Sequence, residues 1–312
     1  MQDEMPSPPV TAEDQTYAEL RPRLFGIAYR MLGSVGEAED VVQEAMLRLH
    51  RAVGGGTAIE SPEAFLTTVT TRIAIDELRS ARVRRETYVG PWLPDPLVAD
   101  RAPDVAHRAD EAESVSMAFL VLLERLSPVE RAAWLLRDVF DYSFDEIARI
   151  VEKSPANVRQ IVVRARRAIE AERPRFETSP ERRDELARRF MSAAQEGDMD
   201  GLLAVLSADV TFTGDGGDKG SGLPRPMVGA ERVARFMLGL MRAASRLGVT
   251  VEAAEVNGQP GLVTNDPDGR IISVMSMVIA DGAVQAIDSV VNPDKLTHLG
   301  PVSDLGRRAI ER

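Results

Sequence analysis

The chain has 312 residues, no cysteine, 44% hydrophobic residues and a formal net charge of −11 at pH 7. This length predicts two or three domains, and the lack of cysteine excludes disulfides, iron–sulfur clusters and cysteine-based zinc sites. With no apolar run of 18 residues or more, we expect no membrane span and a cytoplasmic protein. The acidic total disfavours a protein that coats DNA by itself, so DNA binding is expected on local patches or with a partner.

The first 14 residues are acidic and rich in proline, and we expect them to form a disordered tail. A helical block is predicted over residues 15–86. Its segment from Glu37 to Arg51 has apolar residues at helical spacing, which predicts an amphipathic helix. The outer face of that helix carries Asp40, Gln43, Glu44 and Leu47. A leucine among carboxylates is consistent with a solvated face or with a partner surface.

A second helix of this block is predicted from Glu63 to Arg85, because Ser61-Pro62 is a typical helix start. Between Arg72 and Arg85 it has five arginines and two carboxylates, a local net charge of +3. Residues 87–111 then include four prolines, which is typical of a linker.

A second helical block is predicted over residues 112–176. A short helix over Phe144 to Val151 is followed by a new start at Ser154-Pro155, and the second helix is basic. From Arg159 to Arg175 there are six arginines and two glutamates. The pattern fits a helix-turn-helix whose second helix enters a DNA major groove, or an amphipathic hairpin with a solvated face. Basic stretches on two separate helical domains suggest one protein that binds two DNA sites.

The third block, residues 180–300, predicts an α+β domain with a curved antiparallel sheet. Helical patterns come first, and strand-like runs follow, with Asp-Gly at 268–269 and 281–282 as hairpin turns. Residues 301–312 are expected to form a C-terminal tail.

At this point the residues resemble a known family. The segment RLFGIAYRMLGSVGEAEDVVQEAMLRLHR is similar to region 2 of bacterial sigma factors, and AFLTTVTTRIAIDELRSARVRRE resembles the part that reads and opens the −10 promoter element. LSPVERAAWLLRDVFDYSFDEIARIVEKSPANVRQIVVRARRAIE resembles region 4, which reads the −35 element. This is the layout of small extracytoplasmic-function (ECF) sigma factors, and the third block resembles the cone-shaped SnoaL-like, NTF2-like domain of their SigJ-like group.

The resemblance implies a set of contact residues. Those for the polymerase core, through its clamp helices, are Asp40, Val41, Gln43, Glu44 and Leu47, whereas Val42 is expected in the core of the helical block. Those for −10 DNA are Thr67, Thr71, Arg72, Asp76, Arg79 and Arg82, with the loop over 54–61 capturing an unstacked base. Those for the −35 element are Ser154, Asn157, Arg159, Gln160 and Arg164. Region 4 is also expected to meet the polymerase flap.

The resemblance also implies an interdomain contact between the linker and the third block. Its motifs are Trp92-Leu93-Pro94, Asp215-Gly216-Gly217 with Lys219, and Asn292-Pro293-Asp294-Lys295. Asp218 stands where the group usually has glycine. We interpret the third block as a regulatory domain that sets the placement of the two DNA-binding domains, although a plain glycine-rich turn at Asp215 is also consistent with the pattern.

The sequence therefore predicts a sigma factor whose partners are core RNA polymerase and promoter DNA. A small ligand in the third block is an option, the existence of a separate anti-sigma protein stays open, and no cofactor, metal or enzymatic activity is expected. The alternatives are a stand-alone helix-turn-helix regulator with a ligand-sensing tail, and a cyclase-like or hydrolase-like enzyme. For the enzyme, Asp288 would point into the cone as an acid–base group, although a hairpin or cap contact explains a single strand-end aspartate as well.

Overall fold

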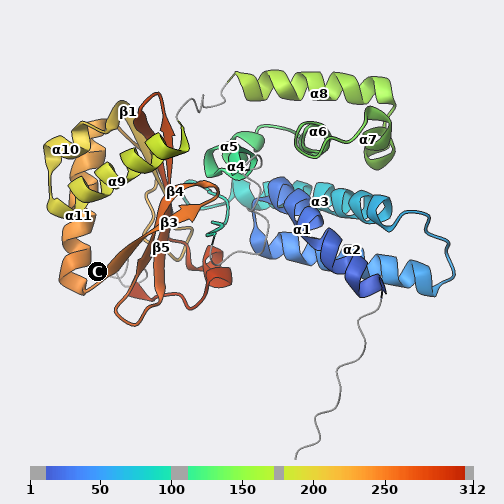
Figure 1. Cartoon of the computed structure of the whole chain (residues 1–312), viewed down its shortest axis with the longest axis horizontal. Coiled ribbons are helices and arrows are strands. Elements are labelled where there is room, and N and C mark those ends of the chain that lie inside the picture. Colours follow the sequence, from blue (N-terminus) through green and yellow to red (C-terminus); the bar gives the residue numbers. More distant parts are fainter. Residues whose placement is uncertain (1–11, 100–111, 172–178, 306–312) are drawn as a thin grey trace, which may run out of the picture.

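The computed structural model describes residues 12–99, 112–171 and 179–305. Figure 1 shows a helical half and a second half in which helices lie on one face of a sheet. The expected fold class, two all-α blocks followed by an α+β domain, is confirmed. Below, the first helical block is residues 12–86, the second helical block is residues 112–171, and the C-terminal domain is residues 179–305.

Serine side chains begin most helices of the helical half. Ser34, Ser61 and Ser154 each accept a hydrogen bond from an amide of the first turn, and Ser127 and Ser143 form capping boxes with glutamates. The helices are α1 (Ala12–Leu32), α2 (Val35–Gly54), α3 (Pro62–Glu86), α4 (Ala112–Val115), α5 (Met117–Leu123), α6 (Pro128–Trp134) with a π-helical turn (Leu135–Val139), α7 (Phe144–Val151) and α8 (Pro155–Glu170). The helix starts predicted at Ser61-Pro62 and Ser154-Pro155 are confirmed.

One continuous hydrophobic core joins the two helical blocks. Leu24 and Leu78 of the first block belong to the same cluster as Leu136 and Ile161 of the second. α3 lies against α6 and α7, while α8 lies on the outer side of α6. The two predicted helical blocks therefore pack directly against each other in this conformation, because their apolar faces bury each other.

The C-terminal domain is a six-stranded sheet with helices on one face. Its helices are α9 (Pro180–Glu196), α10 (Met199–Leu203) and α11 (Ala230–Leu247), and its strands are β1 (Leu206–Asp215), β2 (Met227–Val228), β3 (Thr250–Val256), β4 (Gln259–Asn265), β5 (Ile271–Ala280) and β6 (Ala283–Val290). The strand order is β2-β1-β6-β5-β4-β3. The Asp-Gly turns join antiparallel neighbours, as predicted.

The pairing of β1 with β6 is parallel, so the expectation of an antiparallel sheet is wrong at this pair. Turn residues report only on strands that follow each other in the chain, and β1 and β6 are far apart in sequence. The sequence therefore contains no local signal for this pairing.

The linker segment from Leu93 to Val98 is packed and buried. Leu93, Leu97 and Val98 are at most 3% exposed, and Val98 forms a bridge with Val256 of β3. This stretch therefore packs against both the helical half and the C-terminal domain and connects them.

Two predicted boundaries shift in the structure. Residues 12–14 of the expected N-terminal tail belong to α1, and residues 1–11 lie outside the described residues. In the expected C-terminal tail, Val302 and Ser303 pair with Ile271 of β5, and residues 306–312 lie outside. Within the described ranges, no helix is long and apolar enough to cross a bilayer.

Candidate functional site: two arginine-rich helices and an interdomain cluster

The basic helix α8 presents its predicted contact residues to solvent. Val158, Ile161 and Val162 face the core, which leaves Asn157, Arg159, Gln160 and Arg164 exposed on the other side. Ser154 is also exposed, and its hydroxyl caps the helix by accepting from the Asn157 amide at 3.3 Å. The ring of Phe144 supports Arg159, whose guanidinium lies 5.1 Å from the ring centroid. The helix is open along the face that would meet a duplex (Figure 1).

Val163 is a surface residue of this helix that the sequence reasoning missed. It is 43% exposed by residue and lines a shallow groove together with Arg159, Gln160 and Arg164. An exposed aliphatic side chain among amide and guanidinium groups suits contact with a thymine methyl group. The signal was available in the sequence, because Val163 is an apolar residue on the polar side of an otherwise amphipathic helix.

If Arg164 contacts a base of the −35 element, as the resemblance implies, Arg164→Ala should weaken binding to this element by about 1–3 kcal/mol, the worth of a well-placed arginine contact to a base. The measurement is transcription with core polymerase from promoters with intact and mutated −35 elements. Arg166→Ala is the matched control, because both arginines pair with a carboxylate of the second block, Arg164 with Glu130 at 3.5 Å and Arg166 with Asp138 at 2.6 Å, but Arg166 lies on another side of the helix. Equal effects of the two substitutions would contradict the assignment.

The second arginine-rich helix, α3, is covered by the second helical block along the face expected to meet −10 DNA. Thr67 is 1% exposed, and its hydroxyl lies 3.0 Å from the Tyr142 hydroxyl in the loop before α7. Arg72 donates to the carbonyls of Arg149 and Ile150 at 2.9 Å each. These carbonyls lie in the last turn of α7, where a helix offers them no partner of its own. Arg72 of the first helical block therefore caps the C-terminal end of α7.

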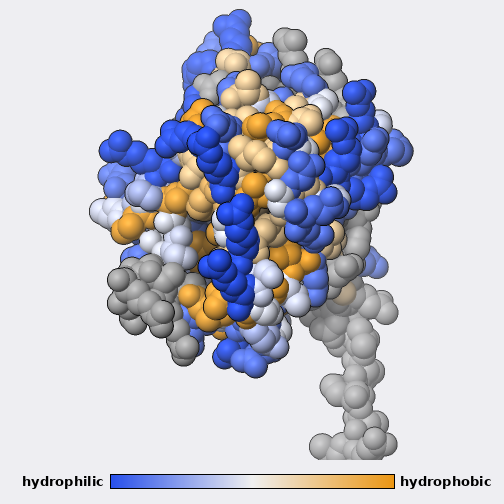
Figure 2. Space-filling view, turned by 90° about the vertical axis from the view of Figure 1, so that its left-hand side faces the viewer, coloured by the Kyte–Doolittle hydropathy of each residue, from blue (hydrophilic) through white to orange (hydrophobic). Residues whose placement is uncertain are grey.

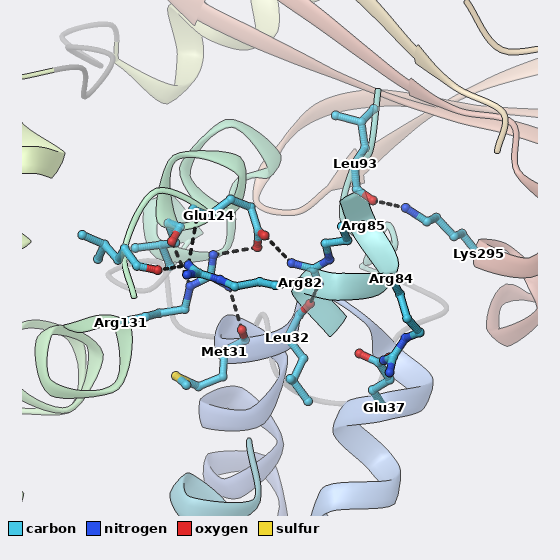
Figure 3. A network of polar contacts seen from close by, with 12 residues as sticks. Met31, Leu32, Glu37, Arg82, Arg84, Arg85, Leu93, Glu124, Arg131 and Lys295 are labelled. Carbon is cyan, nitrogen blue, oxygen red and sulfur yellow. Dashed lines mark hydrogen bonds and ion pairs between the residues drawn. The ribbon is translucent and has the colours of Figure 1, made fainter. Parts of the chain in front are cut away.

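The basic end of α3 makes contacts of the same kind with two more helix ends. Arg82 donates to the carbonyls of Glu124 and Leu126 after α5, and Arg85 donates to the Leu32 carbonyl at the end of α1. Figure 3 shows these side chains converging from α3 on the second helical block. Cations are favoured at helix C-termini because of the partial negative charge there.

Glu124 is the carboxylate at the centre of this network. It forms ion pairs with Arg85 and with Arg131, which is 1% exposed. Burial would raise the pKa of Glu124, but the two arginines hold the pKa below its usual range. Burial lowers the pKa of Arg131 to about 10. Arg131 also donates to the Met31 carbonyl at 2.7 Å, which ties the second block to α1 (Figure 3).

The structure therefore corrects part of the −10 set. Thr67 and Thr71 are buried. Arg72, whose side chain is 44% exposed, and the half-buried Arg82 both donate to carbonyls of the second block. Asp76 and Arg79 are exposed and form an ion pair with each other at 2.7 Å. The loop between α2 and α3 is mostly exposed, as its expected role requires. The Thr71 hydroxyl is buried without a hydrogen-bond partner, which is unusual in a folded protein.

The surface expected to bind polymerase lies on α2. Asp40, Gln43 and Leu47 are exposed, and Glu44 is half-buried beside Arg48 at 2.8 Å. Val41 is 2% exposed and packs in the helical core. Its assignment as a polymerase contact is wrong in this conformation, because the period of the helix turns it inward with Val42, which was expected in the core.

The predicted interdomain residues meet around one buried carboxylate, Asp215, at the end of β1. It is fully buried and accepts from the Leu93 amide at 2.8 Å and from the Lys295 ammonium at 2.7 Å. Lys295 also donates to the Leu93 carbonyl. Burial lowers the pKa of Lys295, and Asp215 opposes that effect. We call these residues, with Trp92 and Tyr88, the Asp215 cluster.

Trp92 and the residues after it dock on the turn between α1 and α2. The Arg85 guanidinium lies over the Trp92 ring, 3.7 Å from the ring centroid. The Lys295 ammonium lies 4.5 Å from the same centroid. A Cβ atom at Gly33 would come within 2.6 Å of this ring, so only glycine fits there. Pro94 is buried, and the Asp95 carboxylate accepts from the Val35 amide at 2.9 Å.

The glycine-rich loop after Asp215 packs against the Asn292–Lys295 motif. Gly217 has φ of 56°, and Asn292 donates to the Tyr88 hydroxyl at 2.8 Å. Gly216 lies so close to the Gly222 backbone that a Cβ atom would clash, and Lys219 pairs with Asp294 at 2.6 Å. Pro293 begins a buried 3-10 turn. Asp218, which replaces the usual glycine, does not have a positive φ and so needs no glycine-like backbone freedom.

A second interdomain contact was missed by the sequence reasoning. Asn257, in the β3–β4 turn, is 1% exposed and has φ of 51°. Its amide donates to the Tyr29 hydroxyl of α1 and to the Val115 carbonyl, both at 2.8 Å, and its oxygen accepts from the Leu97 amide at 2.9 Å. Asn-Gly is also an ordinary hairpin turn, so the sequence did not distinguish this role.

Asp288 lies on the sheet face away from the helices. Its register partners are Thr213 and Ser276, whereas the neighbouring Ile287 lies in the core under α9 and α11. Successive residues of a strand point to opposite faces. The expectation that Asp288 points into the cone is therefore wrong. Within the described residues, no group of acidic or histidine side chains has the arrangement of a metal site.

Three family models match the chain. Sigma-70 region 2 matches residues 16–84, Sigma-70, region 4 matches residues 116–169, and the SnoaL-like domain matches residues 187–294. The matched ranges coincide with the first helical block, the second helical block and the C-terminal domain.

Two relatives match most of the length of the chain. The chain is 39% identical over 294 residues to ECF RNA polymerase sigma factor SigJ of Mycobacterium tuberculosis, covering 91% of this chain and 93% of the relative. It is 32% identical over 281 residues to the probable ECF RNA polymerase sigma factor SigI of the same species, covering 89% and 93%. The crystal structure of M. tuberculosis SigJ matches with a TM-score of 0.72 at 36% identity, covering 92% of this chain and 99% of that one.

Proposed function

Since the chain belongs to the ECF family of sigma-70 factors, we propose that the conformation described here is its closed state, with the −10-reading helix covered. The chain is an RNA polymerase sigma factor, with region 2 in the first helical block and region 4 in the second. The stand-alone regulator is not favoured, because such a protein has no use for region 2.

The observation that carries the proposal is the contact of α3 with the second helical block. Arg72 and Arg82 donate to main-chain carbonyls there, and Thr67 is buried against Tyr142. Phosphates and base edges would need the same donors. Binding of −10 DNA along this face and the closed state therefore exclude each other.

Two further surfaces remain accessible in the closed state. α8 offers Asn157, Gln160 and Arg164 to the −35 element, and α2 offers Asp40, Gln43 and Leu47 to core polymerase. Polymerase binding is proposed to separate the two blocks, after which α3 reads and opens the −10 element. This equilibrium needs only a few kcal/mol of differential binding.

We propose that the C-terminal domain stabilises the closed state, and we call this role the brace. The Asp215 cluster fixes the linker, and Asn257 connects α1 to the backbone of α4 at Val115. Because the closed state itself covers α3, inhibition does not require a separate anti-sigma protein. An enzymatic role receives no support, since Asp288 faces away from the helices and the His298 ring bonds the Pro96 carbonyl at 2.8 Å.

The basic test is a pull-down of core polymerase with the full chain and with a version that ends near Thr178. The full chain should bind polymerase, and the shortened chain should bind at least as well and start more transcription. Failure of both versions to bind core polymerase would contradict the sigma function. Equal transcription by both would contradict the brace.

Tyr142→Phe should favour the open state by a factor of about 2–10, because it leaves the buried Thr67 hydroxyl without its partner at about 0.5–1.5 kcal/mol. The measurement is the rate of −10-dependent transcription at limiting core polymerase, which should rise. Tyr17→Phe makes the same chemical change on an exposed side chain of α1 and should have no effect. A rate that stays constant or falls in Tyr142→Phe would contradict the closed-state proposal.

A further inference from the structure

A groove of about 720 Å³ lies between α9 and the β3–β4 hairpin of the C-terminal domain. Its apolar lining includes Ala187, Met191, Val251, Leu262 and Met277. This volume lies in the range of sites for small organic molecules, and methionine side chains adapt to different ligand shapes. Figure 2 shows that apolar side chains also reach the surface at the end of the molecule near α9–α11.

One cation of this groove, Arg183, forms no ion pair with a carboxylate of the described residues. Arg183 of α9 is half-buried, and its Nε atom is buried without a hydrogen-bond partner. Its Nη1 atom donates to the oxygen of Gln259, which is 2% exposed, at 3.3 Å. The other charged lining residues, Asp184, Arg188 and Glu255, are exposed and of both signs.

We propose that this groove binds an organic anion, with its carboxylate on Arg183 and its apolar body along Met191, Leu262 and Met277. A half-buried guanidinium without a carboxylate partner gains most from an anionic ligand, since charge-assisted hydrogen bonds are the strong ones. An uncharged molecule of the same shape would leave Arg183 unpaired, which disfavours its binding.

The groove adjoins the Asn257 contact between domains. Gln259 pairs with Val256 across the turn formed by Asn257 and Gly258, and Gly258 also lines the groove. Asn257 in turn holds Tyr29, Leu97 and Val115. A ligand that moves this turn would change the contact that braces the closed state. This coupling rests on the proposed function, whereas binding of the anion does not.

The test is isothermal titration calorimetry of the full chain with octanoate, 4-phenylbutyrate and the uncharged 1-octanol, each at up to about 1 mM. At least one carboxylate should bind saturably, and 1-octanol should bind at least about tenfold more weakly. Arg183→Gln should weaken the carboxylate by about tenfold, while Arg182→Gln, the neighbour outside the groove lining, should not. Ala187→Phe should reduce binding by filling the groove.

Each contrary result has a defined meaning. Absence of saturable binding by both carboxylates, equal affinity for 1-octanol, or unchanged affinity in Arg183→Gln would overturn the anion site. Hydrogen exchange at the Leu97 and Asn257 amides measures the coupling, and exchange that stays the same with bound carboxylate would overturn it. Neither result bears on the Tyr142→Phe experiment, so the closed state is tested separately.

Discussion

Asp215→Ala is expected to detach the C-terminal domain from the linker and to lower the free energy of unfolding by about 3–5 kcal/mol. Asp215 is fully buried, and Lys295, whose side chain is 10% exposed, lies 2.7 Å from it. The substitution leaves this ammonium buried without its counter-charge, and it also leaves the Leu93 amide without an acceptor. Calorimetry should show a lower transition temperature.

The matched control for this substitution is Asp268→Ala. Asp268 also forms an ion pair, with Arg270 at 2.7 Å, but its side chain is 73% exposed. Exposed pairs contribute at most about 1 kcal/mol, so little change is expected. The double variant Asp215→Ala with Lys295→Met should recover part of the loss, because it removes the unpaired charge. Asp215→Ala with wild-type stability would show that the cluster does not hold the domains together.

Asp288→Asn is expected to stabilise the protein at pH 7 by about 2–3 kcal/mol. Burial raises the pKa of Asp288 to about 6 from 3.8, against the hydrogen bond from Thr213, which lowers it. The Asp288 carboxyl therefore binds a proton more tightly in the folded chain than in the unfolded chain. The resulting stability is present below pH 4 and is lost as the pH rises through about 6. Asparagine is neutral throughout and keeps an acceptor for Thr213.

Urea unfolding of wild type and Asp288→Asn between pH 4 and 8 measures this difference, which should grow as the pH rises from about 4 to about 6 and then level off. Asp281→Asn is the control, because Asp281 is exposed in the β5–β6 turn at φ of 51°, a conformation that asparagine also adopts. A difference that is constant over this pH range, or a less stable Asp288→Asn variant, would rule out the buried ionisation.

Local signals predicted most of the elements. Ser61-Pro62 and Ser154-Pro155 mark helix starts because capping and the missing proline amide act within a few residues. The Asp-Gly turns likewise fix their hairpins. The motifs at Trp92, Asp215 and Lys295 meet as the resemblance implied, although no local pattern in the sequence indicates the buried ion pair between Asp215 and Lys295.

The remaining features depend on contacts between distant segments. Thr67 and Arg72 look like DNA contacts in the sequence, and nothing local shows that Tyr142 and the end of α7 cover them. Val41 was assigned outward by motif, while helix geometry turns it inward. The parallel β1–β6 pair and the reach of Asn257 to Tyr29 join residues whose sequence neighbours give no sign of either contact.

The linker's docking has a mechanical consequence. Because Gly33 and Trp92 join the first helical block to the linker that the C-terminal domain holds, the second helical block is the part that moves in the proposed opening, once the contact of Asn257 with Val115 is released. The covalent chain between Ala171 and Ser179 can reach at most about 25–30 Å, which limits how far this block can move from the C-terminal domain. The C-terminal domain would thus set an upper limit on the distance between the two promoter elements that one chain can bind.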